Sequence, residues 1–197
     1  MAQISPNPVQ KTSIRTAKKE TKVIRNTYQT EAERHFYITT KDFFALLQPK
    51  KEGVGGIGQL THIRTLKIRQ RWLTNGLTES GFAYRTRIRE TQEIVPVKSE
   101  KTYEYTTKFD TQTNAVVELN VPITALEHAI LCKIYPETVQ VCKTRFICAD
   151  NDNGTIYSFD LYDDGDKIRV EVEYDNIQKL KEYETPEWLS AIAVKGE

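Results

Sequence analysis

Hydrophobic and polar residues alternate with a period of two along most of the chain after Gln29. Eight segments show this alternation and are rich in Val, Ile, Thr, Tyr or Phe: 29–39, 64–73, 82–93, 101–109, 114–121, 138–148, 155–162 and 167–174. Turn-forming pairs separate several of them: Asn75-Gly76, Ser80-Gly81, Asn153-Gly154 and Asp164-Gly165. The pattern predicts an α+β, mainly β fold built on an eight-stranded antiparallel sheet, either open or closed into a barrel.

Three short segments have helical rather than strand character: 42–47, 123–133 and 176–193. Thr40 can cap the first segment, and Pro49 ends it. The second places four apolar side chains on one stripe: Ile123, Leu126, Ile130 and Leu131. The third is interrupted near Pro186, so we expect one or two helices there.

The composition narrows the class of protein. The chain has 197 residues, 39% hydrophobic and 28% charged, which fits one large domain or two small ones. A net charge of +1 excludes a uniformly basic nucleic-acid binder. There is no run of 18 apolar residues, and the N-terminal segment lacks the apolar core of a secretory signal. Three cysteines without a C-x-x-C pair favour free thiols in a reducing cytoplasm, so we expect a cytoplasmic protein without a membrane partner.

Two segments stand outside the alternating pattern. Residues 1–28 are lysine-rich and almost without apolar periodicity, and we interpret them as a flexible basic arm rather than a nucleic-acid-binding tail. The glycine-rich segment 52–59 lacks G-K-[ST] and follows no predicted strand, so we expect a surface loop and not a phosphate loop.

Charged side chains share one face of strand after strand, because residues two apart in a strand point the same way. The acids gather in the first and last strands and the bases in the middle: Glu31, Glu33 and His35; Arg85, Arg87 and Arg89; Glu104 and Lys108; Glu118; Lys143 and Arg145; Asp160; Arg169, Glu171 and Glu173. This face either lies in water on one side of a sheet or points into a barrel. Inside a barrel the charges would need partners, which a divalent cation and a polyanion would supply.

The order of the motifs resembles that of the CYTH superfamily, the triphosphate tunnel metalloenzymes. The run Glu31-Ala32-Glu33-Arg34-His35-Phe36 resembles the opening E-x-E-x-K-F motif. Later runs resemble, in family order, the remaining motifs: Ile68-Arg69-Gln70-Arg71-Trp72-Leu73, Arg85-Thr86-Arg87, Thr106-Thr107-Lys108, Glu118 to Pro122, Lys143-Thr144-Arg145-Phe146, Ser158-Phe159-Asp160, Glu171-Val172-Glu173 and the late segment Pro186-Glu187-Trp188-Leu189. The resemblance extends over roughly residues 29–190.

The resemblance implies a closed eight-stranded antiparallel barrel, or tunnel, with a few peripheral helices, formed by a domain of residues 29–197. It implies Mg²⁺ or Mn²⁺ as cofactor and places the metal among Glu31, Glu33, Asp160, Glu171 and Glu173. It assigns a bound triphosphate to the bases Arg85, Arg87, Lys108, Lys143 and Arg145. Glu118 and His35 take the catalytic positions, with Glu118 supporting the metal or an adjacent base.

The activity that the resemblance implies first is a divalent-metal-dependent triphosphatase acting on inorganic, nucleoside or other organic triphosphate. The alternative is a tunnel protein that binds or sequesters a nucleotide or polyphosphate without hydrolysis, and a class IV adenylyl cyclase ranks lower. Three positions depart from the family pattern: His35 replaces a lysine, Trp72 replaces a tyrosine, and Glu118 stands without further acids on its strand face. The first and the third favour binding over turnover. The expected partner is a triphosphate-containing small molecule, and nothing beyond the family itself indicates an RNA 5′-triphosphate.

Overall fold

The computed structural model describes residues 27–48, 58–79, 81–110, 116–163, 165–174 and 176–194. The strands are β1 (Thr27–Thr39), β2 (Leu60–Leu77), β3 (Ala83–Val95), β4 (Val97–Asp110), β5 (Val116–Ile123), β6 (Gln140–Asp150), β7 (Ile156–Tyr162) and β8 (Lys167–Tyr174). The helices are α1 (Thr40–Leu47), α2 (Ala125–Ile134), α3 (Ile177–Glu182) and α4 (Glu187–Ile192). The prediction of a mainly β, antiparallel eight-stranded sheet with few helices is confirmed.

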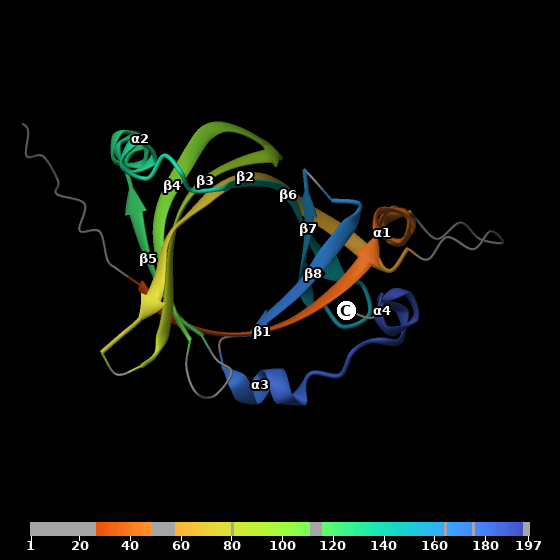
Figure 1. Cartoon of the computed structure of the whole chain (residues 1–197). Coiled ribbons are helices and arrows are strands. Elements are labelled where there is room, and N and C mark those ends of the chain that lie inside the picture. The colour runs from red at the N-terminus through yellow and green to blue at the C-terminus, as the bar shows by residue number, and fades with distance from the viewer. Residues whose placement is uncertain are drawn as a thin grey trace, which may run out of the picture.

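The strands are joined in the order β1-β5-β4-β3-β2-β6-β7-β8, and β8 pairs again with β1. Seen along its axis in Figure 1, the sheet forms a ring. The expectation of a closed barrel needs a correction at β1. Residues 27–31 of β1 pair with β5 and residues 32–39 pair with β8, so no residue of this strand is paired on both sides. The strand order closes on itself, but each residue of β1 is paired with a neighbouring strand on one side only. The wall of the ring is therefore interrupted beside β1.

A hydrophobic core lies outside the ring, on the side of β1, β7 and β8. Helices α1 and α4 cover this side in Figure 1, and α3 lies beside β1. The core side chains alternate with inward-pointing charges along the same strands, as the period of two requires. The fully buried aromatic and aliphatic members come from both strands and helices: Ile38, Phe43, Leu46, Phe159, Ile168, Val170 and Leu189.

The helices differ from the sequence predictions in two details. Thr39 rather than Thr40 caps α1, and its hydroxyl accepts a hydrogen bond from the Asp42 amide at 3.1 Å. In α2 the predicted apolar stripe does not enter a core, since Leu126 is 70% exposed and Ile130 47%. A capping box, rather than burial, starts this helix: Thr124 and Glu127 bond each other's backbone amides. The predicted break near Pro186 is confirmed by the gap between α3 and α4.

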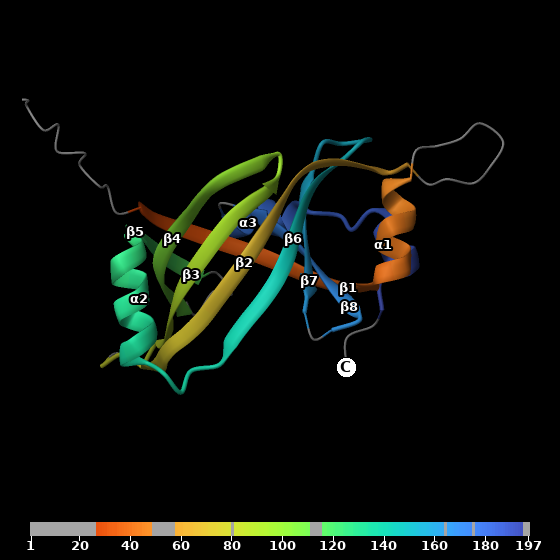
Figure 2. The same cartoon turned by 90° about the horizontal axis from the view of Figure 1, so that it is seen from above.

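Figure 2 shows the ring from above, with α2 at one end and α1 at the other. Of the predicted arm, residues 1–26 lie outside the described residues, and the last two belong to β1. Residues 52–57 of the expected glycine-rich surface loop also lie outside them. None of the helices described here is both long and apolar enough to cross a membrane.

Candidate functional site

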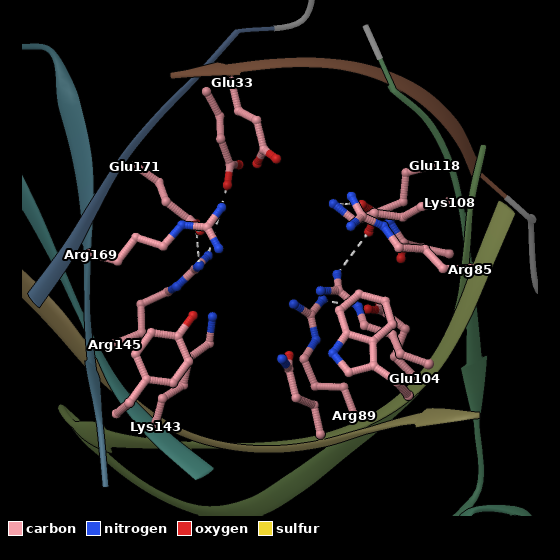
Figure 3. A pocket seen from close by; sticks show the side chains of 16 residues that line it. Glu33, Arg85, Arg89, Glu104, Lys108, Glu118, Lys143, Arg145, Arg169 and Glu171 are labelled. Atoms are coloured by element: carbon pink, nitrogen blue, oxygen red, sulfur yellow. Dashed lines mark hydrogen bonds and ion pairs between the residues drawn. The ribbon is translucent and has the colours of Figure 1, made fainter. Parts of the chain in front are cut away.

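A cavity of about 410 Å³ lies inside the ring, and we call it the lumen. Each of the eight strands contributes at least one side chain to it. Seven bases line it: Arg85, Arg87, Arg89, Lys108, Lys143, Arg145 and Arg169. Five carboxylates face them: Glu33, Glu104, Glu118, Glu171 and Glu173. Gln70, Trp72, Asn120 and Tyr162 complete the lining, and Figure 3 shows these charged groups converging from opposite sides.

The lumen brings together nine of the predicted site residues: Glu33, Arg85, Arg87, Lys108, Glu118, Lys143, Arg145, Glu171 and Glu173. Three others are placed differently. The side chain of Glu31 lies outside the described residues, Asp160 is buried behind the lining, and His35 lies beside Glu33 without lining the lumen. The prediction gave no role to Glu104, Asn120, Tyr162 or Arg169. The alternation had placed Glu104 and Arg169 on the charged face, but no motif of the resembling family assigned them a role.

On the side formed by β6, β7 and β8, which we call the β6–β8 wall, Asp160 anchors two bases. Its carboxylate has no exposed surface and accepts hydrogen bonds from Lys143 Nζ at 2.5 Å and from Arg145 Nε at 2.7 Å. Burial alone would raise the pKa of Asp160, but the hydrogen bonds and charges of these bases outweigh it and hold the pKa below its ordinary value. Burial also lowers the pKa of Lys143. With its oxygens engaged by two bases, Asp160 acts here as an anchor for the lining.

Arg145 extends this network toward β8. Its guanidinium forms an ion pair with Glu171, and a second contact reaches Glu173 at 3.9 Å. Arg169 Nε lies 3.2 Å from the other oxygen of Glu171. Two guanidinium groups and two glutamates therefore meet at the inner face of β8.

On the opposite side, the β3–β5 wall formed by β3, β4 and β5, Glu118 has the role that Asp160 has on the first wall. It is 2% exposed, and its oxygens lie 3.2 Å from Arg87 Nη2 and 2.6 Å from Lys108 Nζ. Burial lowers the pKa of Arg87 despite this carboxylate. The expected contact between Glu118 and adjacent bases is thus present.

Trp72 lies over the bases of β3. The guanidinium carbons of Arg85 and Arg87 are 5.4 and 5.7 Å from the centre of its rings, within the range of cation–π attraction. The structure gives Arg85 no carboxylate partner among the described residues, and its buried Nε has no hydrogen-bond acceptor. Arg85 is therefore the lining base whose charge has the least compensation from described residues.

A second cavity of about 580 Å³ continues from the lumen and shares Arg89, Glu104, Arg145 and Glu173 with it. Arg89 Nη2 and a Glu104 oxygen are 2.5 Å apart at this boundary. Much of the second cavity is apolar or aromatic, lined by Leu66, Ile68, Tyr103, Pro122, Ile147 and Ile156. The cavity system is therefore strongly charged in one part and amphipathic in the next.

Three potential metal ligands meet where β1 and β8 pair. One donor atom from each of Glu33, His35 and Glu171 lies within 4.8 Å of the other two. A hydrogen bond from His35 outweighs burial and lowers the pKa of Glu33 to about 2, so this carboxylate is ionised at neutral pH. Carboxylates and imidazole suit a divalent cation, and the donor set fits the expected metal.

Neither a protein-family model nor a curated protein sequence matches the chain. Among solved structures, a conserved hypothetical protein from Pyrococcus furiosus is similar, with a TM-score of 0.50 and 20% identity over 77% of this chain and 84% of that chain. The inorganic triphosphatase NE1496 is also similar, with a TM-score of 0.40 and 21% identity over 80% of this chain and 82% of that one. At these identities the likeness concerns the fold.

Proposed function

We propose that this chain is a divalent-metal-dependent triphosphatase whose substrate binds in the lumen. One observation carries the proposal: seven bases and five carboxylates from six strands converge on a single cavity of about 410 Å³. This volume falls within the usual range for small-molecule sites, roughly 300–1,000 Å³. Such a density of paired charge is costly to maintain inside a protein, and a polyanion together with a cation is the ligand pair that matches it.

The distribution of the bases suits a chain of phosphoryl groups better than a single one. Arg85 lies on one wall, and Lys143 and Arg145 lie on the other, with the lumen between them (Figure 3). Arg87 lines the lumen from the same strand as Arg85. Arginine forks and lysine ammonium groups bind phosphate oxygens through charge-assisted hydrogen bonds. A triphosphate can meet both walls at once, whereas orthophosphate can meet only a part of them.

Glu33 and Glu171 would hold Mg²⁺ or Mn²⁺, with Glu31 and Glu173 as further candidates from the same two motifs. When bound, the metal supplies charge neutralisation and orientation of water for phosphoryl transfer. The lining arginines and lysines would orient the phosphates. They would also neutralise the charge left on the diphosphate when water attacks the terminal phosphorus and the bridging P–O bond breaks.

Binding without hydrolysis is the second candidate, and His35 is the observation that favours it. In the resembling family a lysine at this position is assigned to phosphate contact and water activation, whereas His35 does not line the lumen.

The second cavity bears on the identity of the substrate under either candidate, because its apolar surface could accommodate an organic group attached to the triphosphate. Nothing in this surface identifies adenine, so adenylyl cyclase remains the least supported activity. The cytoplasmic location expected from the free thiols is retained as part of the proposal.

Phosphate release tests the proposal. Purified protein should release orthophosphate from tripolyphosphate or a nucleoside triphosphate with Mg²⁺ or Mn²⁺, and should lose this activity in chelator. The double variant Glu171→Gln, Glu173→Gln should be inactive while remaining folded. Release at the same rate in chelator would contradict the metal-dependent activity. Tight triphosphate binding with no release under any metal would favour the second candidate.

A further inference from the structure

His35 lies directly across from Glu171 in the antiparallel pairing of β1 with β8, and Glu33 lies across from Glu173. Side chains of directly paired residues project to the same side of a sheet, so the backbone ladder itself brings His35 and Glu171 together. His35 Nε2 is 3.2 Å from a Glu33 oxygen. The ligand atoms of Glu33, His35 and Glu171 lie within 4.8 Å of one another, close to the span of about 4 Å between opposite ligands of one small divalent ion.

An imidazole nitrogen changes which ion such a site prefers. Mg²⁺ strongly favours oxygen ligands, whereas Mn²⁺, Co²⁺ and later divalent metals accept imidazole with rising affinity. We infer that Glu33, His35 and Glu171 form a mixed nitrogen–oxygen metal site that selects Mn²⁺ or Co²⁺ over Mg²⁺. The inference deepens the proposed function, since it gives His35 the role of a metal ligand in place of a phosphate contact.

The position of His35 supports this assignment over direct contact with the substrate. It does not line the lumen, so a phosphate bound among the lining bases would meet Glu33 and Arg169 before the imidazole. The ring lies on the β1 side, where two carboxylates are within reach. A histidine that faces carboxylates from two strands is suited to share a cation with them.

Arg169 contacts ligand atoms of His35 and Glu171 that a bound metal ion would need. Its guanidinium donates to Nδ1 of His35, with Nε at 3.2 Å and Nη2 at 2.9 Å, lies 2.8 Å from Nε2 of the same ring, and lies 3.2 Å from Glu171. Because a guanidinium and a divalent ion repel each other, the two should occupy this group of ligands alternately. An ion bound there would release the guanidinium of Arg169, which already lines the lumen, for contact with the anion.

The test uses metal titration without any triphosphate. Calorimetry should measure Mn²⁺ and Mg²⁺ affinities of the unmodified protein, His35→Gln and Arg169→Gln, and visible absorption should follow Co²⁺. His35→Gln exchanges a nitrogen ligand for an amide oxygen of similar reach, so Mn²⁺ affinity should fall at least about tenfold, Mg²⁺ affinity should change little, and the Co²⁺ spectrum should shift. Arg169→Gln should raise the affinity for both ions.

His128→Gln is the matched control, because His128 lies on α2 with Cys132 Sγ 3.9 Å from its ring nitrogen and offers an alternative nitrogen ligand. The control should leave every metal affinity unchanged. Equal loss of Mn²⁺ and Mg²⁺ in His35→Gln, no loss of either, or a loss in the control instead would overturn the inference. An unchanged metal affinity in Arg169→Gln would show that Arg169 does not compete with the ion for these ligands. Since triphosphate is absent, these results are independent of whether the protein binds or hydrolyses it.

Discussion

The two walls of the lumen repeat one arrangement with different support behind it. On the β6–β8 wall a buried carboxylate, Asp160, holds Lys143 and Arg145, and on the β3–β5 wall Glu118 holds Arg87 and Lys108. In both cases one carboxylate is almost fully buried and two bases project from it into the cavity. The inner chemistry of the two walls is therefore nearly the same.

The outer support of the walls differs. The β6–β8 wall is continuous with a core that includes Phe159, Val170 and Leu189, all without exposed surface. On the other side α2 contacts β4, but none of its own side chains is buried. Ion pairs inside the lumen can therefore align bases without a large core behind them. The wall backed by the core should nevertheless carry most of the stability.

Removal of core volume should show the largest difference between the walls. Phe159→Ala should lower the free energy of unfolding by about 3–5 kcal/mol, because it leaves a cavity among buried side chains. Ile130→Ala on α2 should change it by no more than about 0.5 kcal/mol, since Ile130 is 47% exposed. Denaturant unfolding measures both values. Comparable losses in the two variants would show that the walls are supported alike.

Removal of the anchoring charge should affect both walls in the same way. Asp160→Asn removes one carboxylate from Lys143 and Arg145, and Glu118→Gln removes one from Arg87 and Lys108, so each should cost about 3 kcal/mol of unfolding free energy. Glu79→Gln, at an exposed position outside the lumen, is the control and should have little effect. A large loss for one anchor and none for the other would break the equivalence of the walls.

Removal of a lining base should affect ligand binding more than stability. Arg85→Ala should weaken tripolyphosphate binding by about 1.5–3 kcal/mol, the range for hydrogen bonds to charged groups. Arg69→Ala is the matched control, because the side chain of Arg69 is 62% exposed and pairs with Glu90 outside the lumen. Calorimetry with both variants measures the difference. Equal affinities would remove Arg85 from the binding surface.

The smallest effect concerns thiol reactivity. Burial raises the pKa of Cys148 to about 12, so this thiol stays protonated well above neutral pH, and only the thiolate reacts readily. Cys132 and Cys142 are partly exposed. At about pH 8 alkylation should label these two before Cys148, as mass spectrometry of peptides would show. Rapid labelling of Cys148 in folded protein would indicate that the core side opens easily.

Much of the lumen could be predicted from sequence because period-two alternation fixes the face of each side chain. Nine predicted site residues line the cavity for this reason, and so does Arg169, which the alternation placed on the same face as Glu171 although no role was assigned to it. Alternation does not report depth. Asp160 points inward, but it lies opposite Arg145 in the β6–β7 pairing and beneath its guanidinium, so it does not reach the cavity. Only the register between strands establishes such layering.

The exposed stripe of α2 and the interrupted pairing of β1 were also beyond prediction. An amphipathic stripe such as that of Leu126 and Ile130 predicts a buried face only if another element covers it, and the sequence of the helix does not contain that information. Likewise, each half of β1 has ordinary strand character. Its division between β5 and β8 depends on the relative shift of distant strands.

The central claim is that both walls of the lumen bind one triphosphate together. Calorimetric titration with tripolyphosphate and with orthophosphate, in the presence of Mg²⁺ or Mn²⁺, tests it most directly. Tripolyphosphate should bind more than about tenfold more tightly, because each additional phosphoryl group gains charge-assisted hydrogen bonds that orthophosphate cannot make at the same time. Arg85→Ala on one wall and Arg145→Ala on the other should each reduce this preference. Equal affinity for the two anions, unchanged by either variant, would contradict the account.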